Sequence, residues 1–166
     1  MVLTWVQVSH WRNSITIFKH AISVTDEKYP AFSAAHYNLG RALFAERKTE
    51  EAISHYKTAI RLKPDLVEAH NNLGNALFAE RKTKEAISHY KTAIKLDPDY
   101  AEAHYNLGKA LFFEQKTEEA VSQYKMVIKL RPDLAAAHNN LGNALTVLGR
   151  TKEADYHLKI AKESIQ

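Results

Sequence analysis

The chain has 166 residues, of which 45% are hydrophobic and 25% charged, and its formal net charge is +4. This composition is typical of a globular protein with a sizeable core. The absence of cysteine excludes disulfide frameworks, thiolate metal sites and cysteine nucleophiles. The mixed, weakly basic charge does not predict a nucleic-acid surface. No apolar run approaches the ~18–20 residues that span a bilayer. We therefore expect a soluble protein, cytoplasmic by default.

The N-terminal segment, residues 1–32, predicts one helix followed by a joint. Within it, residues 11–24 place a small, an aromatic and a small side chain at Ser14, Phe18 and Ala21. These three positions share one face of a helix. The ten residues before this stretch are too short for another full helix of the same kind.

From residue 33 onward the sequence repeats itself every 34 residues. A pentapeptide, His-Tyr/Asn-Asn-Leu-Gly, begins at His36, His70, His104 and His138. Two successive stretches, 33–66 and 67–100, are identical at 26 of 34 positions. Such a period indicates an array of one supersecondary unit that stacks on its neighbours.

Each repeat predicts two helices joined by a polar turn. In the second repeat one apolar face passes through Leu73 and Leu77, and another through Ala86 and Tyr90, each at helical spacing. Gly74 within the first of these helices costs ~1 kcal/mol relative to alanine. We expect this glycine to allow the two helices to approach closely.

The starts of the helices carry residues that favour capping. Asp65 with Glu68, and Asp99 with Glu102, have the spacing of a capping box. Thr83 precedes the apolar face of a second helix, where a threonine side chain commonly caps the first turn. We therefore expect these three side chains to cap their helices.

These motifs resemble the tetratricopeptide repeat (TPR) family, whose repeat has small, large and small residues at the same offsets. The resemblance implies an all-α, right-handed α-solenoid of antiparallel helix pairs, four 34-residue repeats and an N-terminal half-repeat, with no separate capping helix. The predicted organisation is a half-repeat helix and joint at 1–32, then repeats at 33–66, 67–100, 101–134 and 135–166.

A second resemblance concerns the N-terminal segment alone. Residues 4–25 resemble the lead-in of TPR tails on bacterial and archaeal multi-span, mannosyltransferase-like membrane proteins. This resemblance implies a soluble regulatory tail of a membrane-bound glycosyltransferase-like protein, which would lie outside the cytoplasm.

The residue types that carry catalysis do not form a reactive pattern. Repeat-related histidines lie on helices at least ~8–10 Å apart, which makes a shared metal ion awkward. Adjacent pairs such as Ser54 and His55 point about 100° apart on a helix and cannot form a nucleophile–base pair. We expect no enzyme activity, no catalytic or metal-binding residues and no cofactor.

The resemblance also implies a binding groove lined by the first helix of each repeat. Mapped onto this sequence, its polar and aromatic positions are Tyr37, Asn38, Arg41, Phe44, Asn71, Asn72, Asn75, Phe78, Tyr105, Asn106, Lys109, Phe112, Asn139, Asn140 and Asn143. Among them one asparagine recurs in every repeat, at Asn38, Asn72, Asn106 and Asn140.

An asparagine amide offers two donors and an acceptor, which match a peptide backbone. The repeated asparagine therefore predicts a groove that holds an extended peptide, although it can equally bond the backbone of neighbouring first helices. The basic residues Arg41 and Lys109 favour acidic ligands. The family's carboxylate clamp is absent, because Tyr37, Asn71 and Glu102 replace its lysines.

The sequence predicts a protein-interaction scaffold without nucleic-acid binding or membrane insertion. The alternatives are a structural spacer that acts through its ends and the glycosyltransferase tail. We also expect self-association through uncapped ends, which would expose Trp5, Trp11, Ile15 and Phe18 at one end and Ala154, Leu158, Ala161 and Ile165 at the other.

Overall fold

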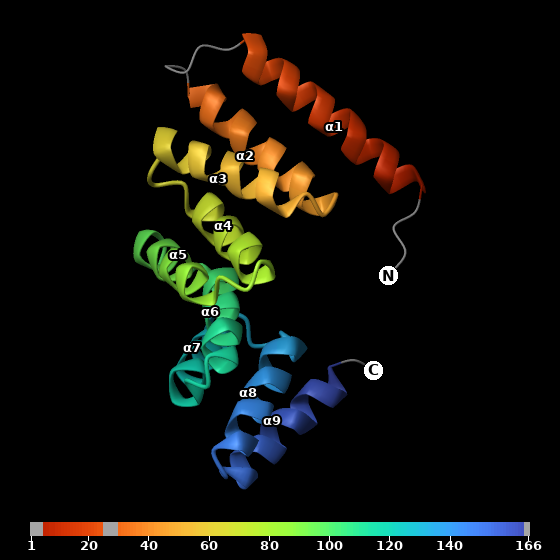
Figure 1. Ribbon diagram of the computed structural model, residues 1–166. Helices are drawn as coiled ribbons and strands as arrows, with labels where there is room; N and C mark the ends of the chain where they lie inside the picture. The colour runs from red at the N-terminus through yellow and green to blue at the C-terminus, as the bar shows by residue number, and fades with distance from the viewer. Residues whose placement is uncertain (1–4, 25–29, 165–166) are drawn as a thin grey trace. The chain divides into compact units, whose positions relative to one another are not determined.

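The structure is a computed structural model that describes residues 5–24 and 30–164. Within these residues the secondary structure is helical throughout (Figure 1). The helices are α1 (Trp5–Val24), α2 (Pro30–Ala45), α3 (Thr49–Leu62), α4 (Val67–Ala79), α5 (Thr83–Leu96), α6 (Ala101–Phe113), α7 (Thr117–Leu130), α8 (Ala135–Val147) and α9 (Thr151–Glu163). The predicted all-α class is confirmed.

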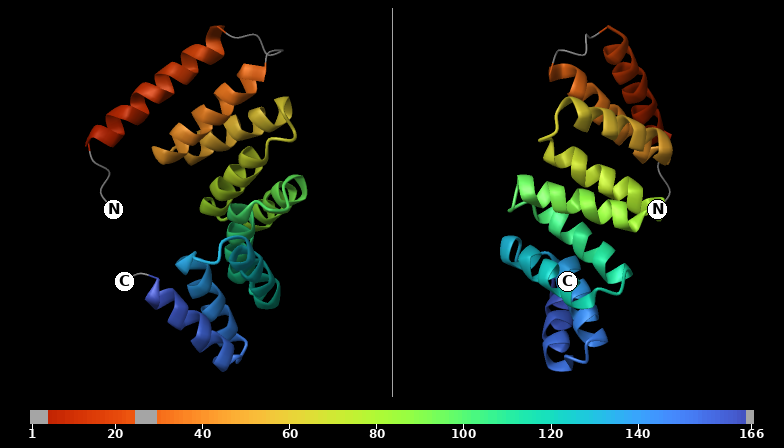
Figure 2. Two further views of the ribbon diagram at one scale, coloured as in Figure 1. Left: turned by 180° about the vertical axis from the view of Figure 1, so that it is seen from behind. Right: turned by 60° about the vertical axis from the view of Figure 1, so that its left-hand side comes forward.

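The helices belong to two compact units, Met1–Lys82 and Thr83–Gln166. In the first unit α1 to α4 pack in chain order, and adjacent helices run in opposite directions (Figures 1 and 2). In the second unit α5 to α9 also pack each against the next. The division falls inside the predicted repeat at 67–100. The repeat boundaries and the right-handed sense of the solenoid stay predictions.

The N-terminal helix is longer than expected, because α1 begins at Trp5 rather than near residue 11. The next helix, α2, begins at Pro30, a residue favoured in the first turn because it has no N–H that needs a partner.

The expectation that Ile15 is exposed is wrong. Its side chain is 8% exposed, whereas Ile17 on the same helix is 63% exposed. The side chains of Trp5 and Trp11 lie outside the described part of the chain.

Glycine in the first helix of a pair allows a large side chain of the second helix to lie against the backbone. A Cβ atom on Gly108 would lie 2.6 Å from Cε1 of Tyr124, a distance at which the ring would have to move. Tyr124 is 2% exposed, so it has little room to do so. The expected packing role of this glycine position is therefore confirmed in three pairs: Gly40 with Tyr56, Gly108 with Tyr124, and Gly142 with Leu158.

The predicted helix caps are wrong. The residue before α4 is Leu66 and the residue before α6 is Tyr100, and neither helix start has a side-chain cap hydrogen bond. Asp65 and Asp99 therefore lie one residue too early to cap. Thr83 is the first residue of α5 itself and is 3% exposed. The turns are closed by backbone bonds instead, such as Leu66 N–H to the carbonyl of Lys63 at 3.2 Å.

The turns within helix pairs share one left-handed backbone position. Arg47, Arg81 and Gln115 have φ near +60°, and Gly149 has φ of 72° at the same place in the last pair. Only glycine adopts this conformation without a steric penalty. Three of the four turns therefore hold a side-chain-bearing residue in a strained conformation.

Candidate functional site

Two of the recurrent asparagines, Asn72 and Asn140, bond a tyrosine of the preceding first helix. In the first unit the Asn72 side-chain Nδ2 on α4 donates to the Tyr37 hydroxyl on α2 at 3.1 Å. In the second unit Asn140 on α8 donates to the Tyr105 hydroxyl on α6 at the same distance. We call the surface of α2 and α4 that carries the first pair, and the surface of α6 and α8 that carries the second, the first-helix face of the respective unit.

Each pair keeps further hydrogen-bonding capacity. A tyrosine hydroxyl that accepts a bond still has its own O–H to donate, and an asparagine Oδ1 has two acceptor positions. Asn72 Oδ1 receives one long contact, 3.5 Å, from Asn71 Nδ2. Tyr37, Tyr105, Asn72 and Asn140 are all partly exposed. Each pair therefore presents a donor and an acceptor side by side to a ligand.

The two tyrosine rings are held on both sides. The Tyr37 ring lies 6.2 Å from the ring of buried Tyr56, and the Tyr105 ring 6.3 Å from that of Tyr124. On the outer side, Arg41 Cζ lies 5.8 Å from the Tyr37 ring centre. Such a stack of buried tyrosine, exposed tyrosine and cation restricts the rotamers of the groups that a ligand would meet.

The second unit has the same stack, with Lys109 Nζ 5.7 Å from the Tyr105 ring centre. The first unit differs in its charges. Burial raises the pKa of the Tyr37 hydroxyl, and the carboxylate of Glu68 raises it further, while Arg41 and the bond from Asn72 act in the opposite direction. A carboxylate therefore faces the tyrosine–cation stack of the first unit.

A pocket of about 240 Å³ lies beside the stack of the second unit. Its lining comes from the start of α6, the residues that precede α8 and the first turn of α8. Its charged lining residues Arg131 and Glu102 form an ion pair at 3.0 Å, with both side chains about half exposed. The rest of the lining is Ala101, Tyr105, Asn106, Leu134 and Ala136.

The structure places the predicted groove residues at different depths. Fourteen of the fifteen are accessible, but Asn71 is only 4% exposed, so its side chain offers little surface to a ligand. Its counterpart in the last repeat, Asn139, is exposed. The partly exposed members are Tyr37, Asn38, Phe44, Asn72, Asn75, Phe78, Tyr105, Asn106 and Asn140, and the exposed members are Arg41, Lys109, Phe112, Asn139 and Asn143.

Sequence reasoning missed the tyrosine–asparagine bonds. The available signal was the alternation at the residue after the histidine, which is tyrosine at 37 and 105 and asparagine at 71 and 139. The asparagine occurs in all four repeats, whereas the tyrosine that it bonds occurs in only two of them, at Tyr37 and Tyr105.

The histidines of the repeated pentapeptide are buried hydrogen-bonding groups. His138 is 4% exposed, and its Nε2 lies 3.0 Å from the carbonyl oxygen of Pro132. A carbonyl only accepts, so Nε2 carries the proton and Nδ1 accepts from His157 Nδ1 at 3.0 Å. His104 has the same bond to Pro98, and its Nδ1 lies 2.8 Å from the Gln123 amide. These bonds give the histidines a structural role.

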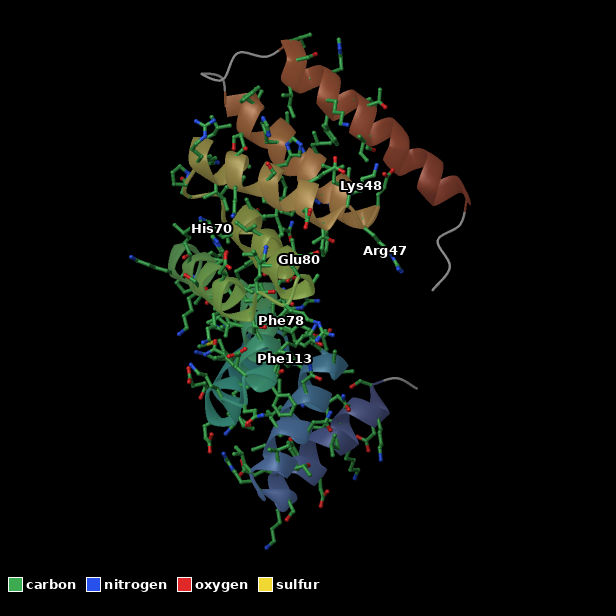
Figure 3. All side chains as sticks on the ribbon, viewed as in Figure 1. Arg47, Lys48, His70, Phe78, Glu80 and Phe113 are labelled. Carbon is green, nitrogen blue, oxygen red and sulfur yellow. The ribbon has the colours of Figure 1, made fainter. Side chains whose placement is uncertain are left out.

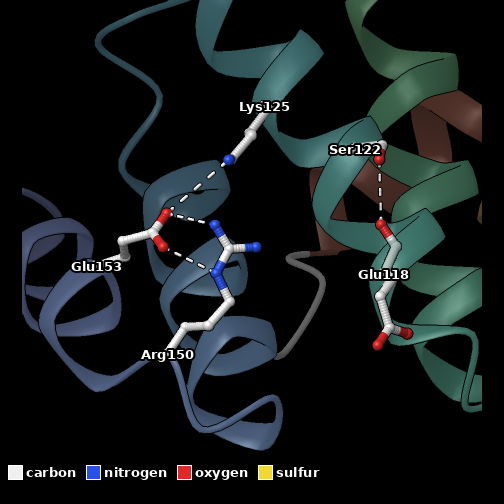
Figure 4. Close-up of polar contacts among 5 residues, drawn as sticks. All are labelled: Glu118, Ser122, Lys125, Arg150 and Glu153. Atoms are coloured by element: carbon white, nitrogen blue, oxygen red, sulfur yellow. Dashed lines mark hydrogen bonds and ion pairs between the residues drawn. The ribbon is translucent and has the colours of Figure 1, made fainter.

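The polar turns carry mixed charge. At the turn between α2 and α3, Lys48 Nζ lies 2.8 Å from Glu46 Oε2. A hollow of about 290 Å³ beside this turn is lined by Arg47, Lys48, Thr49, Glu50, Glu51 and Glu80. Figure 3 labels Arg47, Lys48 and Glu80 among them. In the second unit Arg150 makes two bonds to Glu153, at 2.8 and 2.6 Å, and Lys125 approaches the same carboxylate (Figure 4).

Across 5–24 and 30–164, no three histidine, aspartate or glutamate side chains are grouped so that they could hold a metal ion. In the same residues no helix has the length and apolar character required to cross a membrane.

Paired helices with a glycine–tyrosine contact, and a polar face on successive first helices, define an α-helical repeat protein. The sequence matches the family profile described as TPR repeat at residues 40–80, 74–113 and 109–149. These matches together span 40–149, or 110 of the 166 residues. The chain therefore belongs to the TPR family.

Solved structures agree with this assignment. MamA superposes with a TM-score of 0.85 at 23% identity, over 99% of this chain and 96% of that one. YrrB, described as a TPR protein with an unusual peptide-binding site, gives 0.78 at 21% identity, over 96% and 80%. The first TPR of Spaghetti (RPAP3), bound to an HSP90 peptide, gives 0.70 at 29% identity, over 70% and 93%. No curated protein matches the sequence.

Proposed function

We propose that this chain is a non-catalytic protein-interaction scaffold that holds an extended polypeptide on its first-helix face. The observation that carries the proposal is the pair of Tyr37 with Asn72, repeated by Tyr105 with Asn140. The tyrosine O–H matches a backbone carbonyl, and the asparagine Oδ1 matches a backbone N–H. A peptide in extended conformation offers both groups without internal hydrogen bonds.

This proposal differs from the sequence-based prediction, in which the repeated asparagines alone hold the peptide. The Asn72 and Asn140 amides each use one donor within the protein, so part of their role is to orient the neighbouring tyrosine hydroxyl. The ligand-facing unit is then a tyrosine–asparagine pair, which occurs once in each compact unit. Partly exposed aromatic side chains, among them Phe44 and Phe78, add apolar contact along the same helices.

The comparisons lend general support to peptide binding. YrrB is described as having a peptide-binding site, and the RPAP3 repeat was solved with a bound peptide. The lysines of the family's carboxylate clamp, which grips chain termini, are replaced in this chain by residues such as Tyr37 and Glu102. We therefore expect recognition of internal peptide segments rather than of a chain terminus.

A phage-displayed random peptide library, followed by fluorescence anisotropy on the enriched peptides, tests the proposal. We expect Tyr37→Phe with Tyr105→Phe to weaken binding about fivefold or more per lost donor, at ~1 kcal/mol for each hydrogen bond. Tyr156→Phe is the matched control, because Tyr156 is 64% exposed on α9. Unchanged binding in the double variant, with far-UV circular dichroism intact, would contradict the proposal.

The rival function, assembly through the chain ends, is opposed by the residues of α9. At one position of the second helices, α3 has Ile53 and α7 has Val121, which are 8% and 4% exposed. At the equivalent position α9 has Asp155, which is exposed. Ala154 and Ala161, expected to be exposed, are 1% and 3% exposed, so this part of the expected apolar end surface is absent. Ile165 lies outside the described residues, and the glycosyltransferase-tail hypothesis rests on 4–25, whose first and last residues also lie outside.

The end surface can be tested by restoring an internal residue. Asp155→Val gives α9 the side chain that the third repeat has at Val121. We expect the wild type to sediment as a monomer at high micromolar concentration, and the variant to self-associate because the exposed apolar area at its end increases. An oligomeric wild type that Asp155→Val leaves unchanged would favour the assembly function.

A further inference from the structure

The pocket between α6 and α8 lies against a tyrosine that carries a cation on its ring. Tyr105 both lines the pocket and carries Lys109 on its ring, at 5.7 Å from the ring centre. Of the pocket's lining residues, Ala101, Leu134 and Ala136 are aliphatic. A volume of about 240 Å³ admits one medium-sized aliphatic side chain, with room for the approach of its backbone.

The Lys109 ammonium contacts an aromatic ring rather than a carboxylate. Within the described residues of the second unit it makes no ion pair, whereas Arg131, Arg150 and Lys125 each lie beside a carboxylate. Its side chain is exposed and its ammonium is positioned by the Tyr105 ring rather than by an acid. A cation held in this way is available to a carboxylate of a ligand.

The corresponding place in the first unit has a different charge. The residue equivalent to Ala136, two repeats earlier in the sequence, is Glu68. The carboxylate of Glu68 raises the pKa of the Tyr37 hydroxyl. There a carboxylate stands where the second unit has a methyl group. It disfavours an apolar side chain by its hydration and an acidic one by repulsion.

We propose that the pocket between α6 and α8 is a subsite for an aliphatic side chain of an extended peptide that has an acidic residue next to it. The aliphatic side chain enters between Ala101, Leu134 and Ala136, and the neighbouring carboxylate meets Lys109. Glu68 makes the first unit's counterpart unsuitable for the same segment. This subsite rests on the proposed peptide-holding function and names the chemistry of its ligand.

The probes are short peptides of glycine and serine with one leucine followed by two glutamates, acetylated and amidated so that neither terminus is charged. One matched peptide replaces the glutamates by glutamine, and another replaces the leucine by glycine. We expect the leucine–glutamate peptide to bind about fivefold tighter than the glutamine version, the scale of one exposed charge pair. The glycine version should bind about tenfold more weakly because the pocket stays empty.

Two substitutions on the protein assign these preferences to the subsite. Lys109→Asn introduces the residue that the second and fourth repeats have at Asn75 and Asn143, and should abolish the preference for glutamate. Lys152→Asn, an equal change of charge at the start of α9, should leave it. Ala136→Glu, which copies Glu68, should weaken the leucine–glutamate peptide about tenfold.

The outcomes separate the subsite from the proposed function. Equal binding of the glutamate and glutamine peptides, with no effect of Lys109→Asn, overturns the acidic preference and leaves peptide holding intact. Equal losses in Lys109→Asn and Lys152→Asn also overturn it, because long-range charge would then be the cause. If neither these probes nor library-selected peptides bind the wild type, both the subsite and the proposed function fail.

Discussion

The first and second compact units share the packing of their helix pairs and differ on the first-helix face. Buried Tyr56 and Tyr124 lie against a glycine in equivalent pairs, and each supports an exposed tyrosine, Tyr37 or Tyr105. Around these identical stacks, the first unit adds a glutamate and the second an alanine-lined pocket. The difference teaches that the two units keep the same buried positions while their chemistry changes at a few accessible ones.

The shared core predicts equal costs for equivalent substitutions, and these are the largest effects we expect. Tyr56→Ala and Tyr124→Ala should each lower the free energy of unfolding by about 3–5 kcal/mol through the cavity they leave. Tyr→Leu at either position should cost less, because Leu158 already occupies this place against Gly142. Urea denaturation of the four variants measures this, and a difference above 2 kcal/mol between the two alanine variants would show that the cores are unlike.

The left-handed turn residues offer a smaller test in both units. Arg47→Gly in the first and Gln115→Gly in the second should each raise the free energy of unfolding by about 1 kcal/mol, because both residues have positive φ. Gly149→Ala should lower it by a similar amount, since nothing lies within 4 Å of its Cβ position and only the backbone is strained. Thermal melts suffice here, and a destabilised Arg47→Gly variant would refute the strain argument.

The smallest effect concerns pH and the histidine pairs. Burial lowers the pKa of His55, with Lys19 acting in the same direction and Glu51 against it. Burial likewise lowers the pKa of His157, aided by His138 and Lys125 and opposed by Glu153. The unfolded chain therefore binds more protons than the folded one just below the ordinary histidine pKa of about 6.5.

With this sign, stability falls as pH decreases through 6.5 and levels off below the lowered pKa of the folded state. His55→Gln and His157→Gln copy the third repeat, where Gln123 accompanies His104. We expect the double variant to lose less stability than the wild type between pH 7 and pH 5. Parallel urea titrations at the two pH values measure it, and an equal loss in both proteins would exclude these histidines as the cause.

Much of the fold was predictable because it depends on short-range periodicity. The spacing of Leu73 and Leu77 indicates a helical face from the sequence alone, and a glycine followed sixteen residues later by tyrosine identifies a packed pair. The caps were not predictable from spacing, because a shift of one residue at Leu66 decides whether Asp65 can reach the helix end. Helix ends depend on the backbone path of the turn, which the preceding helix determines.

The candidate site was predicted in position but not in detail. The set of exposed positions follows from the repeat, whereas the bond from Asn72 to Tyr37 joins side chains 35 residues apart. Such a partner decides whether a polar side chain forms its hydrogen bonds within the protein or keeps them available for a ligand. The Glu68–Ala136 difference is visible in the sequence, but its meaning requires the pocket beside Ala136.

Chemical-shift mapping tests the central claim most directly. A ¹⁵N-labelled sample titrated with a library-selected peptide should show its largest amide and side-chain shifts on the first-helix face, including the Asn72 and Asn140 side-chain amides and the backbone around Tyr37 and Tyr105. The second helices α3, α7 and α9 should shift little on their outer sides. Shifts concentrated on α9 with none at these asparagine amides would contradict peptide holding by the first-helix face.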